Sequence, residues 1–381
     1  LRITNFTGRS VDDRRCSWLF TYPWFLDVPS WHGIHRFRFT IYSEANRSLY
    51  CEAADNSERN RRILRIMTHS TTALAHPNIA LIKYWGKSNS DLNLPSTPSL
   101  SITLSKLTTR TTISTSEIDV LYINGKSVQD EKISQFLNSL RQTHSVKNIR
   151  IETENNFPTS AGLASSAAGF AALTMALNTH FSLGFSKRKI SSIARTGSAS
   201  AARSIHGGFV GLQGPDWEAE PIVKRDYWPL RIVIATINIE KKKTGSSKGM
   251  EITRFTSPFY QSWVNEAQKD FDEALTAIRN RDFDKLADLS EKNCLKMIAT
   301  MISSDPPLIY WAPATLACIQ LIRELRNSGQ AVFFTTDAGP QVKAICLPES
   351  EAKVIEALAS VVGSKNITSC EIGDEAEIIQ N

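Results

Sequence analysis

The sequence lacks any apolar run long enough to cross a membrane and any cysteine or histidine spacing that is typical of a zinc site. Its longest small and apolar run, residues 167–177, is shorter than the ~20 residues that a membrane-spanning helix needs. The six cysteines form no CxxC pair, and the seven histidines show no HExxH pattern. We therefore expect no membrane partner, no structural zinc, and reduced thiols in a cytoplasmic protein.

The chain also lacks long runs of charge of one sign. Its 381 residues carry a formal net charge of +6, and the basic residues are scattered along the chain. This distribution argues against a nucleic-acid partner. A modest positive excess favours anionic small-molecule substrates, because it raises their concentration near the protein surface.

The first 66 residues differ in composition from the rest of the chain. They contain arginine but no lysine, begin with Leu, and hold three tryptophans without a strong apolar periodicity. We interpret residues 1–66 as a leader that is not part of the catalytic fold, and Met67 as a candidate start of the mature chain. A mitochondrial presequence is the alternative. Acidic residues argue against it, because such peptides avoid them; Asp12, Asp13, Asp27 and Glu44 are among those present.

From Ala73 onward the sequence has the patterns of strands and helices. Short β-type runs alternate with turns as far as residues 149–151, and a loop of small residues then leads into a predicted helix that extends to about Phe181. Residues Arg231–Ile239 are rich in Ile and Val and have turn signals on either side, which predicts a strand.

The second half of the chain is predicted to be largely helical. After Pro258, apolar residues recur at intervals of three and four, which is the period of an amphipathic helix. Two more helices are predicted at 314–326 and 351–362, on either side of an apolar run at 331–334. Because strands are followed by helices without a regular βα alternation, we predict an α+β fold.

The segment 155–169 reads Asn-Asn-Phe-Pro-Thr-Ser-Ala-Gly-Leu-Ala-Ser-Ser-Ala-Ala-Gly and delivers small residues from a proline-led turn into a helix. Gly and Ala let a ligand approach the backbone, and free N–H groups at a helix start favour anions. The hydroxyls of Ser165 and Ser166 can contact phosphate or Mg²⁺. Taken alone, however, a run of this composition is more often a tightly packed small-residue helix.

The string Pro-x-x-x-Gly-Leu-x-Ser-Ser-Ala resembles the ATP loop of the superfamily named for galacto-, homoserine, mevalonate and phosphomevalonate kinases (GHMP kinases). The Walker pattern GxxxxGK[ST] is absent from the sequence. The resemblance implies that ATP binds here, with Ser165 and Ser166 as candidate Mg²⁺ contacts. The implied ATP-binding residues are Pro158, Gly162, Leu163, Ala164, Ser165, Ser166 and Ala167.

Three further segments resemble signatures of one family in that superfamily, the mevalonate diphosphate decarboxylases. The first, residues 77–87, reads Pro-Asn-Ile-Ala-Leu-Ile-Lys-Tyr-Trp-Gly-Lys. Two cations and a phenol near one strand end can hold a diphosphate, although such a segment taken alone would more often be a solvated surface strand. The resemblance implies a catalytic Lys83. It also implies substrate binding by Tyr84, Trp85, Gly86 and Lys87.

The second segment, residues 196–204, reads Thr-Gly-Ser-Ala-Ser-Ala-Ala-Arg-Ser and is similar to the family pattern Gly-Ser-Gly-Ser-Ala-Cys-Arg-Ser. The resemblance implies that serines bond the substrate diphosphate and that Arg203 pairs with its carboxylate or phosphates, a task suited to the planar guanidinium fork. Without the resemblance, Arg203 would be a surface or ion-pair residue. The implied substrate-binding residues are Ser198, Ala199, Ser200, Ala201, Ala202 and Arg203. The resemblance also implies that Arg203 is one of the catalytic residues.

The third segment, residues 335–340, reads Thr-Thr-Asp-Ala-Gly-Pro and resembles the family turn Asp-Ala-Gly-Pro-Asn, with Gln341 at the Asn position. An Asp in such a turn is ordinarily a turn former. The resemblance implies instead that Asp337 is the catalytic base that faces the C3 hydroxyl of the substrate. It also implies that Lys83 lies near Asp337, lowers its pKa and stabilises the developing alkoxide.

Two weaker correspondences complete the implied substrate site. Ser247 falls where the family usually has a substrate-contacting Thr, and Lys132 falls near a family Arg. Ile298 occupies a position where relatives commonly carry His, and no role is assigned to it.

The resemblance extends from about Ala73 to the C-terminus. It implies an N-terminal ATP-loop domain, residues 67–250, and a ferredoxin-like α+β domain, residues 251–381, that carries Asp337. The implied reaction is ATP- and Mg²⁺-dependent decarboxylation of mevalonate 5-diphosphate to isopentenyl diphosphate, with ADP, phosphate and CO₂ as the other products. It belongs to the mevalonate pathway of isoprenoid and sterol biosynthesis, and the enzyme is expected to be a homodimer.

Two other functions remain open at this point. A kinase of the same superfamily would stop at the phosphorylated product, and release of phosphate and CO₂ would exclude it. A binding module that kept the fold would show no turnover. The joint presence of Lys83, Arg203 and Asp337 disfavours that alternative.

Overall fold

The structure, a computed structural model, describes residues 28–30, 33–35, 70–157, 165–237 and 243–379. In the first two ranges, β1 (Val28–Ser30) pairs with β2 (Gly33–His35) in an antiparallel arrangement. The rest of the predicted leader, residues 1–66, lies outside the described residues, so the leader stays a prediction. Residues 70–381 form a separate unit.

The first part of that unit is built on a six-stranded sheet with the order β10-β9-β11-β8-β3-β18. All neighbouring strands are antiparallel except β9 and β11, which are parallel. The strands are β3 (Ser70–Ala75), β8 (Thr109–Thr115), β9 (Val120–Ile123), β10 (Lys126–Ser127), β11 (Ile149–Asn155) and β18 (Glu377–Ile379).

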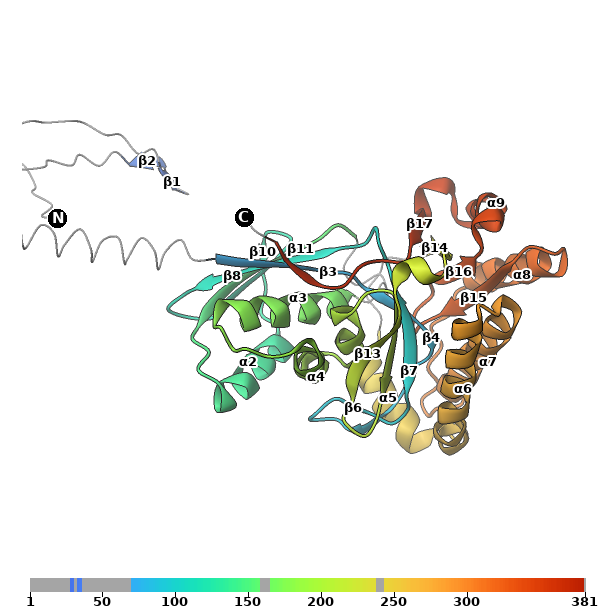
Figure 1. Cartoon of the computed structure of the whole chain (residues 1–381), viewed down its shortest axis with the longest axis horizontal. Coiled ribbons are helices and arrows are strands. Elements are labelled where there is room, and N and C mark those ends of the chain that lie inside the picture. The colour runs from blue at the N-terminus through green and yellow to red at the C-terminus, as the bar shows by residue number, and fades with distance from the viewer. Residues whose placement is uncertain (1–27, 31–32, 36–69, 158–164, 238–242, 380–381) are drawn as a thin grey trace, which may run out of the picture. The chain divides into compact units, whose positions relative to one another are not determined.

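Helix α3 (Ser165–His180) packs against β3 and β8 of this sheet. Its residues from Ala167 to Leu177 are almost all buried, because the helix lies between the sheet and the segment formed by α4 (Lys187–Gly197) and the 3-10 helix η1 (Ala199–Ile205). Alanines along α3 allow this close approach. The predicted helix to about Phe181 is therefore confirmed. Helix α2 (Glu131–Thr143) lies at the same end of the unit of residues 70–381 (Figure 1).

A second, four-stranded antiparallel sheet has the order β13-β12-β7-β4. Its strands are β4 (Asn78–Ile82), β7 (Ser99–Thr103), β12 (Phe209–Gln213) and β13 (Glu218–Val223). Every residue of β4 and β7 is buried. Strand β4 ends directly before Lys83, and a short hairpin of β5 (Lys87–Asn89) and β6 (Leu94–Pro95) follows it.

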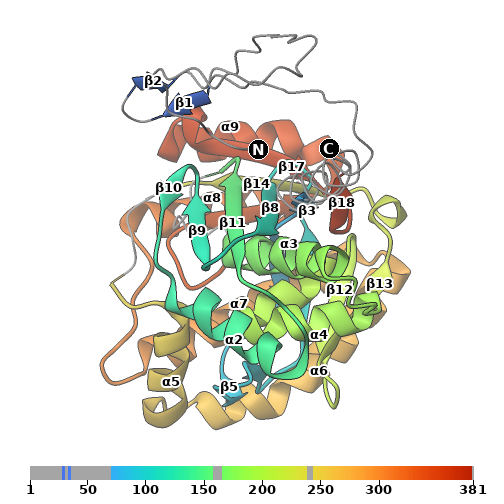
Figure 2. The ribbon, with the colours of Figure 1, turned by 90° about the vertical axis from the view of Figure 1, so that its left-hand side faces the viewer.

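A third sheet, also four-stranded and antiparallel, has the order β15-β16-β14-β17. Its strands are β14 (Arg231–Ala235), β15 (Val332–Thr336), β16 (Val342–Cys346) and β17 (Ile367–Glu371). The helices of this part are α5 (Ser246–Thr256), α6 (Tyr260–Asn280), α7 (Phe283–Ile302), α8 (Pro313–Asn327) and α9 (Glu351–Val362). Three short 3-10 helices connect other elements: η2 (Arg225–Tyr227), η3 (Pro348–Ser350) and η4 (Ser364–Asn366). Figure 2 shows the same ribbon turned by 90°.

The predicted elements of the second half are present in the structure. The helix expected after Pro258 is α6, and the helices expected at 314–326 and 351–362 are α8 and α9. The strand predicted to reach Ile239 ends at Ala235, because its pairing with β16 and β17 stops there; residues 238 and 239 lie outside the described part.

The α+β fold class is confirmed. One core cluster joins the second sheet to the helices and the third sheet, since Ile102 and Phe209 pack in the same cluster as Phe271 and Phe333. Strand β14 pairs in the third sheet although it precedes residue 250. The predicted domain division at residue 250 stays a prediction. Among the described helices, none combines the length and apolarity that crossing a membrane requires.

Candidate active site

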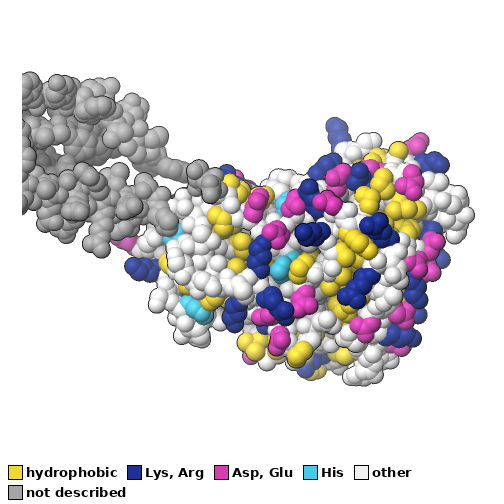
Figure 3. All heavy atoms as spheres, in the orientation of Figure 1, with side chains coloured by type: hydrophobic (Ala, Val, Ile, Leu, Met, Phe, Trp, Pro, Cys, Tyr) yellow, Lys and Arg dark blue, Asp and Glu magenta, His cyan; other side chains and the backbone are white. Residues whose placement is uncertain are grey.

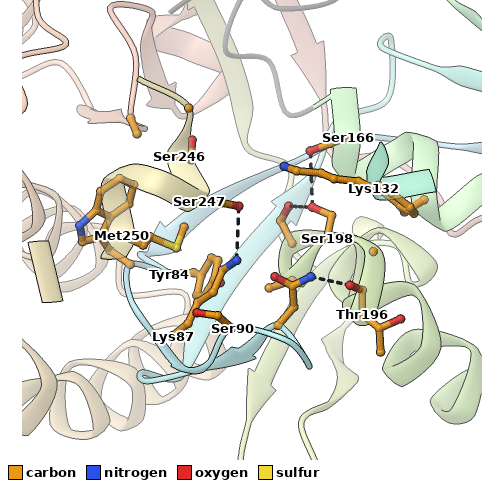
Figure 4. Close-up of a pocket in the computed structure, with 18 of the residues that line it drawn as sticks. Tyr84, Lys87, Ser90, Lys132, Ser166, Thr196, Ser198, Ser246, Ser247 and Met250 are labelled. Atoms are coloured by element: carbon orange, nitrogen blue, oxygen red, sulfur yellow. Dashed lines mark hydrogen bonds between the residues drawn. The ribbon is translucent and has the colours of Figure 1, made fainter. Parts of the chain in front are cut away.

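A cavity of about 780 Å³ lies between the end of β4, the starts of α3 and α5, the segment before Arg203, and the turn after β15 (Figure 4). It therefore collects segments that are far apart in the sequence. The predicted site residues that line it are Lys83, Tyr84, Trp85, Lys87, Lys132, Ser165, Ser166, Ser198, Ala199, Ser200, Arg203, Ser247 and Asp337.

Other predicted residues lie behind the cavity wall or outside the described part. Gly86 has a φ of +108°, and a Cβ atom there would come within 2.2 Å of the Tyr260 hydroxyl, so this position requires glycine. The side chains buried in the protein rather than in the cavity wall are those of Ala167, Ala201 and Ala202. The residues outside the described part are Pro158, Gly162, Leu163 and Ala164.

Asp337 lies between two lysines at the end of β15. The ammonium of Lys83 is 2.8 Å from Oδ1, and the ammonium of Lys343 is 2.8 Å from Oδ2. Both lysine side chains are 1% exposed, whereas the Asp337 side chain is 31% exposed. Burial by itself would raise the pKa of Asp337, but the charges of Lys343 and Lys83 outweigh it and hold that pKa well below its ordinary value. The carboxylate is therefore ionised where it meets the cavity.

Lys343 was not singled out by the sequence reasoning. It is the one charged residue of β16, whose sequence is Val-Lys-Ala-Ile-Cys and whose residues are all buried. A lone Lys within an apolar strand was the available signal, since lysine is almost never fully buried unless it is paired. The pattern does not say which acid pairs with it.

Arg203 is a buried cation that contacts neutral groups. Its guanidinium donates to Ser101 Oγ at 3.0 Å, to Ser99 Oγ, and to Asn78 Oδ1 at 3.3 Å, and the residue is 2% exposed. Burial lowers the pKa of Arg203 to about 10. Within the part of the chain that the structure describes, no carboxylate lies within ion-pair distance of it. A buried charge of this kind favours an anionic ligand.

Hydroxyl groups connect the start of α3 with the segment before Arg203. Ser198 Oγ lies 3.4 Å from Ser166 Oγ and 3.2 Å from Ser200 Oγ (Figure 4). Asn78 donates from the second sheet to Ser204 Oγ at 2.8 Å, which fixes this segment. Hydroxyls can donate to phosphate oxygens, so the arrangement suits an anion bound between the start of α3 and the segment before Arg203.

Two polar groups at the other side of the cavity have unused bonding capacity. Lys87 donates to Ser247 Oγ at 3.3 Å (Figure 4). Burial and the charge of Lys132 lower the pKa of Lys87. The Tyr84 hydroxyl is buried without a hydrogen-bond partner, and burial raises its pKa. The Tyr84 hydroxyl therefore stays protonated at neutral pH, and both groups can donate to a bound ligand.

The charge that lines the cavity is mostly positive. Among the described residues of its wall, the basic ones are Lys83, Lys87, Lys132, Arg203 and Lys243. The acidic ones are Asp91 and Asp337. On the outer face in Figure 3, in contrast, acidic and basic side chains are interspersed. The cavity therefore attracts polyanions selectively, because its walls concentrate charge of one sign.

The structure also shows supporting residues that the sequence reasoning missed. Ser99 and Ser101 alternate with apolar residues in the buried strand β7, and this alternation was the available signal. Asn293 on α7 accepts from the Lys83 backbone N–H at 2.8 Å and donates to Asp270 at 2.8 Å. Ile298, for which no role was predicted, is buried and does not line the cavity.

Comparison with known proteins agrees with this geometry. The family model described as the diphosphomevalonate decarboxylase-like N-terminal domain matches residues 75–219. The model of the mevalonate 5-diphosphate decarboxylase C-terminal domain matches residues 232–379. Together these matches include every described residue of the cavity wall.

One similar protein is the diphosphomevalonate decarboxylase of Debaryomyces hansenii. It is 37% identical to this chain over 317 residues, which cover 75% of this chain and 82% of the relative. The enzyme of Candida albicans is also 37% identical, over 76% of this chain and 88% of the relative.

Solved structures show the same likeness. The mevalonate diphosphate decarboxylase of Staphylococcus aureus superposes with a TM-score of 0.77 at 36% identity, and covers 82% of this chain and 98% of its own. A structure described as MDDEF in complex with MVAPP, AMPPCP and magnesium has a TM-score of 0.78 at 36% identity, over 82% and 99% of the two chains. The chain belongs to the diphosphomevalonate decarboxylase family.

Proposed function

We propose that the protein catalyses the ATP-dependent decarboxylation of mevalonate 5-diphosphate to isopentenyl diphosphate, with release of ADP, phosphate and CO₂. Membership of the family supports this reaction. The observation that carries the proposal is the pair of Asp337 and Lys83, 2.8 Å apart in the wall of a cavity whose charged lining residues, among those described, are mostly cations. A hydroxyl nucleophile and a polyanionic substrate require these two features.

The substrate explains why a kinase-like site serves a decarboxylase. Its carboxylate is β to a tertiary alcohol, and no carbonyl group is present to accept the electrons released with CO₂. Transfer of the terminal phosphoryl group of ATP to the C3 oxygen breaks the O–H bond and the bond to ADP. The C3–O bond then breaks, with its electron pair leaving on phosphate. The C1–C2 bond breaks next, and its electron pair forms the C2–C3 double bond as CO₂ departs.

In this reaction, Asp337 accepts the proton of the C3 hydroxyl. The two lysines keep the carboxylate ionised, and a carboxylate of low pKa can take this proton late in the transfer. In a loose transition state the alcohol becomes strongly acidic only as its oxygen bonds to phosphorus. Lys83 is then placed to stabilise the negative charge on the C3 oxygen.

The remaining cations and donors bind the diphosphate and carboxylate of the substrate. Arg203 supplies a buried positive charge that has no acidic partner among the described residues. The proposed partners of the diphosphate are hydroxyls and amines on both sides of the cavity, and Trp85 and Ala199 form part of its wall. These partners are Tyr84, Lys87, Lys132, Ser198, Ser200 and Ser247.

ATP binds at the start of α3, where Ser165 and Ser166 line the cavity. Among the described residues there is no cluster of three potential acidic, histidine or cysteine ligands for a metal. The hydroxyls of Ser165 and Ser166 instead fit a Mg²⁺ ion that is held mainly by nucleotide phosphates, which is a usual arrangement for Mg²⁺. When bound, Mg²⁺ offsets the charge of the transferring phosphoryl group. The proposed contacts in residues 158–164 lie outside the described part.

A homodimer and a cytoplasmic location are further parts of the proposal. The family resemblance supports the dimer. The cytoplasmic location is supported by the cysteines of the described part, whose thiols are all free and buried: Cys294, Cys318, Cys346 and Cys370. Light scattering of the purified protein tests the first, and fractionation of cells that make it tests the second. A monomer, or recovery in another compartment, would contradict these parts alone.

The decisive experiment measures ADP, phosphate and CO₂ from mevalonate diphosphate that carries carbon-14 in its carboxylate. We expect equal amounts of the three products, and none without ATP. A kinase that stops at the phosphorylated product would release ADP without labelled CO₂. A binding module would release none of the three.

A further inference from the structure

We infer that Lys343 is a positioning residue of the decarboxylase: it holds the carboxylate of Asp337 from behind, so that Lys83 and the exposed edge of that carboxylate are left for the substrate. This inference rests on the proposed function, since it assigns Lys343 a part in proton transfer to Asp337. It is carried by the position of the two lysines relative to the cavity.

The two lysines contact different oxygens from different sides. Lys83 bonds Oδ1 of Asp337 at 2.8 Å, and both of these residues line the cavity. Lys343 bonds Oδ2 at the same distance of 2.8 Å, but it does not line the cavity. Lys343 therefore lies behind the carboxylate, and a bound substrate meets Lys83 and Asp337 first.

Backbone pairing fixes Lys343 in this place. Strands β15 and β16 are antiparallel neighbours, with Lys343 opposite Thr335, and β14 pairs with the other edge of β16 through Ile234. The tight turn between β15 and β16 is held by a bond from the Gly339 N–H to the Asp337 carbonyl at 2.6 Å. Because Lys343 lies on a central strand and its side chain is buried, its ammonium has little freedom to move away from the turn.

The charge balance indicates that Lys343 serves Asp337. Among the described residues, Asp337 is the one carboxylate within ion-pair distance of Lys343, and likewise of Lys83. The charged groups that face Asp337 are Lys83 after β4, Lys343 on β16, and Arg203 on η1. Burying a lysine in a strand where an apolar side chain would suit the core is costly. Its place at the rear of the proposed base supplies the compensating interaction.

Two consequences follow for catalysis. Contact with Lys343 at Oδ2 limits rotation of the Asp337 carboxylate, so its other oxygen stays directed toward the cavity. The same contact helps to keep the carboxylate ionised. Loss of Lys343 should therefore slow the chemical step and leave substrate binding nearly unchanged, because Lys343 does not reach the cavity.

The test compares Lys343→Met, which keeps the length but removes the charge, with Lys343→Arg, which keeps a charge. The matched control is Lys285→Met, which breaks the surface pair with Glu273. We expect Lys343→Met to lower kcat by about 10-fold to 100-fold, as a misplaced catalytic group does, with the KM values for both substrates changed less than about twofold. We expect partial recovery in Lys343→Arg and parent activity in Lys285→Met. An unchanged kcat in Lys343→Met, or a raised KM for mevalonate diphosphate with normal kcat, would overturn the inference.

A second readout does not depend on turnover. NMR of protein labelled with carbon-13 at the aspartate carboxyls follows the titration of Asp337. The Asp337 signal is assigned as the one that is missing in Asp337→Asn. In Lys343→Met we expect the Asp337 titration midpoint to rise by about 1–3 pH units, the usual effect of losing one close opposite charge. Lys343→Arg should reverse most of that rise. An unchanged midpoint in Lys343→Met would contradict the proposed contact.

Stability provides the remaining check, because Lys343→Met leaves Asp337 with one ammonium partner. If this variant folds poorly, Lys343→Met/Asp337→Asn should fold better, since both partners of the contact are then neutral. A double variant no more stable than Lys343→Met would show that the two side chains are not coupled. Absence of CO₂ release by the parent would reject the decarboxylase function instead, and would leave the carbon-13 result unaffected.

Discussion

The cations of the cavity and the cations elsewhere in the molecule are balanced in different ways. On the third sheet, Arg231 forms ion pairs with Glu351 at 3.1 Å and Glu371 at 2.9 Å. In the cavity, the more deeply buried Arg203 donates to hydroxyl and amide oxygens, and Lys87 donates to a serine. The charge of the first region is neutralised within the protein, whereas much of the charge in the second has no acidic partner in the part of the chain that the structure describes.

The difference separates structural charge from binding charge. A partly exposed ion pair such as that of Arg231 contributes little to stability, about 0–1 kcal/mol. A buried cation without an acid destabilises the empty protein, and binding of an anion removes that penalty. Asp337 differs from the other charged groups of the cavity in this respect, because its carboxylate forms ion pairs with two lysines, Lys83 and Lys343.

The largest effect is expected at Asp337, where Asp337→Asn keeps the shape but removes the proton acceptor. We expect turnover to fall at least ~10²-fold, within the usual range for general bases, with ATP binding little changed. The control is Asp119→Asn, which weakens the Arg141 pair outside the cavity and should leave turnover unchanged. Single-turnover CO₂ release and nucleotide binding measure the two quantities. Near-normal decarboxylation by Asp337→Asn would remove Asp337 from the mechanism.

A smaller loss is expected from Arg203→Lys, which keeps the positive charge but loses the planar fork that binds two oxyanion atoms. We expect kcat/KM for mevalonate diphosphate to fall by about 10-fold or more, since a lost hydrogen bond to a charged group costs roughly 1.5–3 kcal/mol. Arg231→Lys is the matched control and should retain parent kcat/KM, because its partners are acids of the protein itself. Equal kcat/KM for Arg203→Lys and the parent would place Arg203 away from the substrate.

Alkaline pH should weaken substrate binding gradually. Burial and Lys132 lower the pKa of Lys87, so Lys87 loses its charge at a lower pH than an ordinary lysine. The dissociation constant for mevalonate diphosphate should therefore rise with pH before ordinary lysines titrate. Calorimetric titrations from neutral to alkaline pH measure this rise. In Lys87→Met the early rise should be absent, and the later rise should follow Arg203, whose pKa is about 10. An identical pH profile in Lys87→Met would contradict the role of Lys87.

The smallest effect is expected from removal of the predicted leader. A protein that begins at Met67 should decarboxylate as well as the full chain, because the described residues of the cavity wall all lie at or after Asn78. Calorimetry and the CO₂ assay compare the two proteins. The aromatic residues of the first 66 positions are the main reason to expect otherwise, since such side chains favour burial. A thermal midpoint several degrees lower in the shortened protein would make residues 1–66 part of the fold.

The sequence by itself determined the features that depend on local pattern. Apolar spacing after Pro258 located α6, because burial of one helix face leaves a period of about 3.6 residues. The helices predicted at 314–326 and 351–362 are α8, within one residue at each end, and α9, with the same bounds. The short motifs indicated Lys83, Arg203 and Asp337 as members of one site. Strand ends were less accurate: β14 ends at Ala235 rather than Ile239, since pairing partners and not composition end a strand.

Only the tertiary structure decided which of these groups touch. Lys83 and Asp337 are 254 positions apart and meet at 2.8 Å, and Lys343 approaches the same carboxylate from a neighbouring strand. The serines that hold Arg203 come from β7, about a hundred positions earlier in the chain. Residue patterns record whether a side chain is buried, but the order of strands in a sheet determines its neighbours. For that reason the sequence indicated the proposed base, and the fold showed the second lysine behind it.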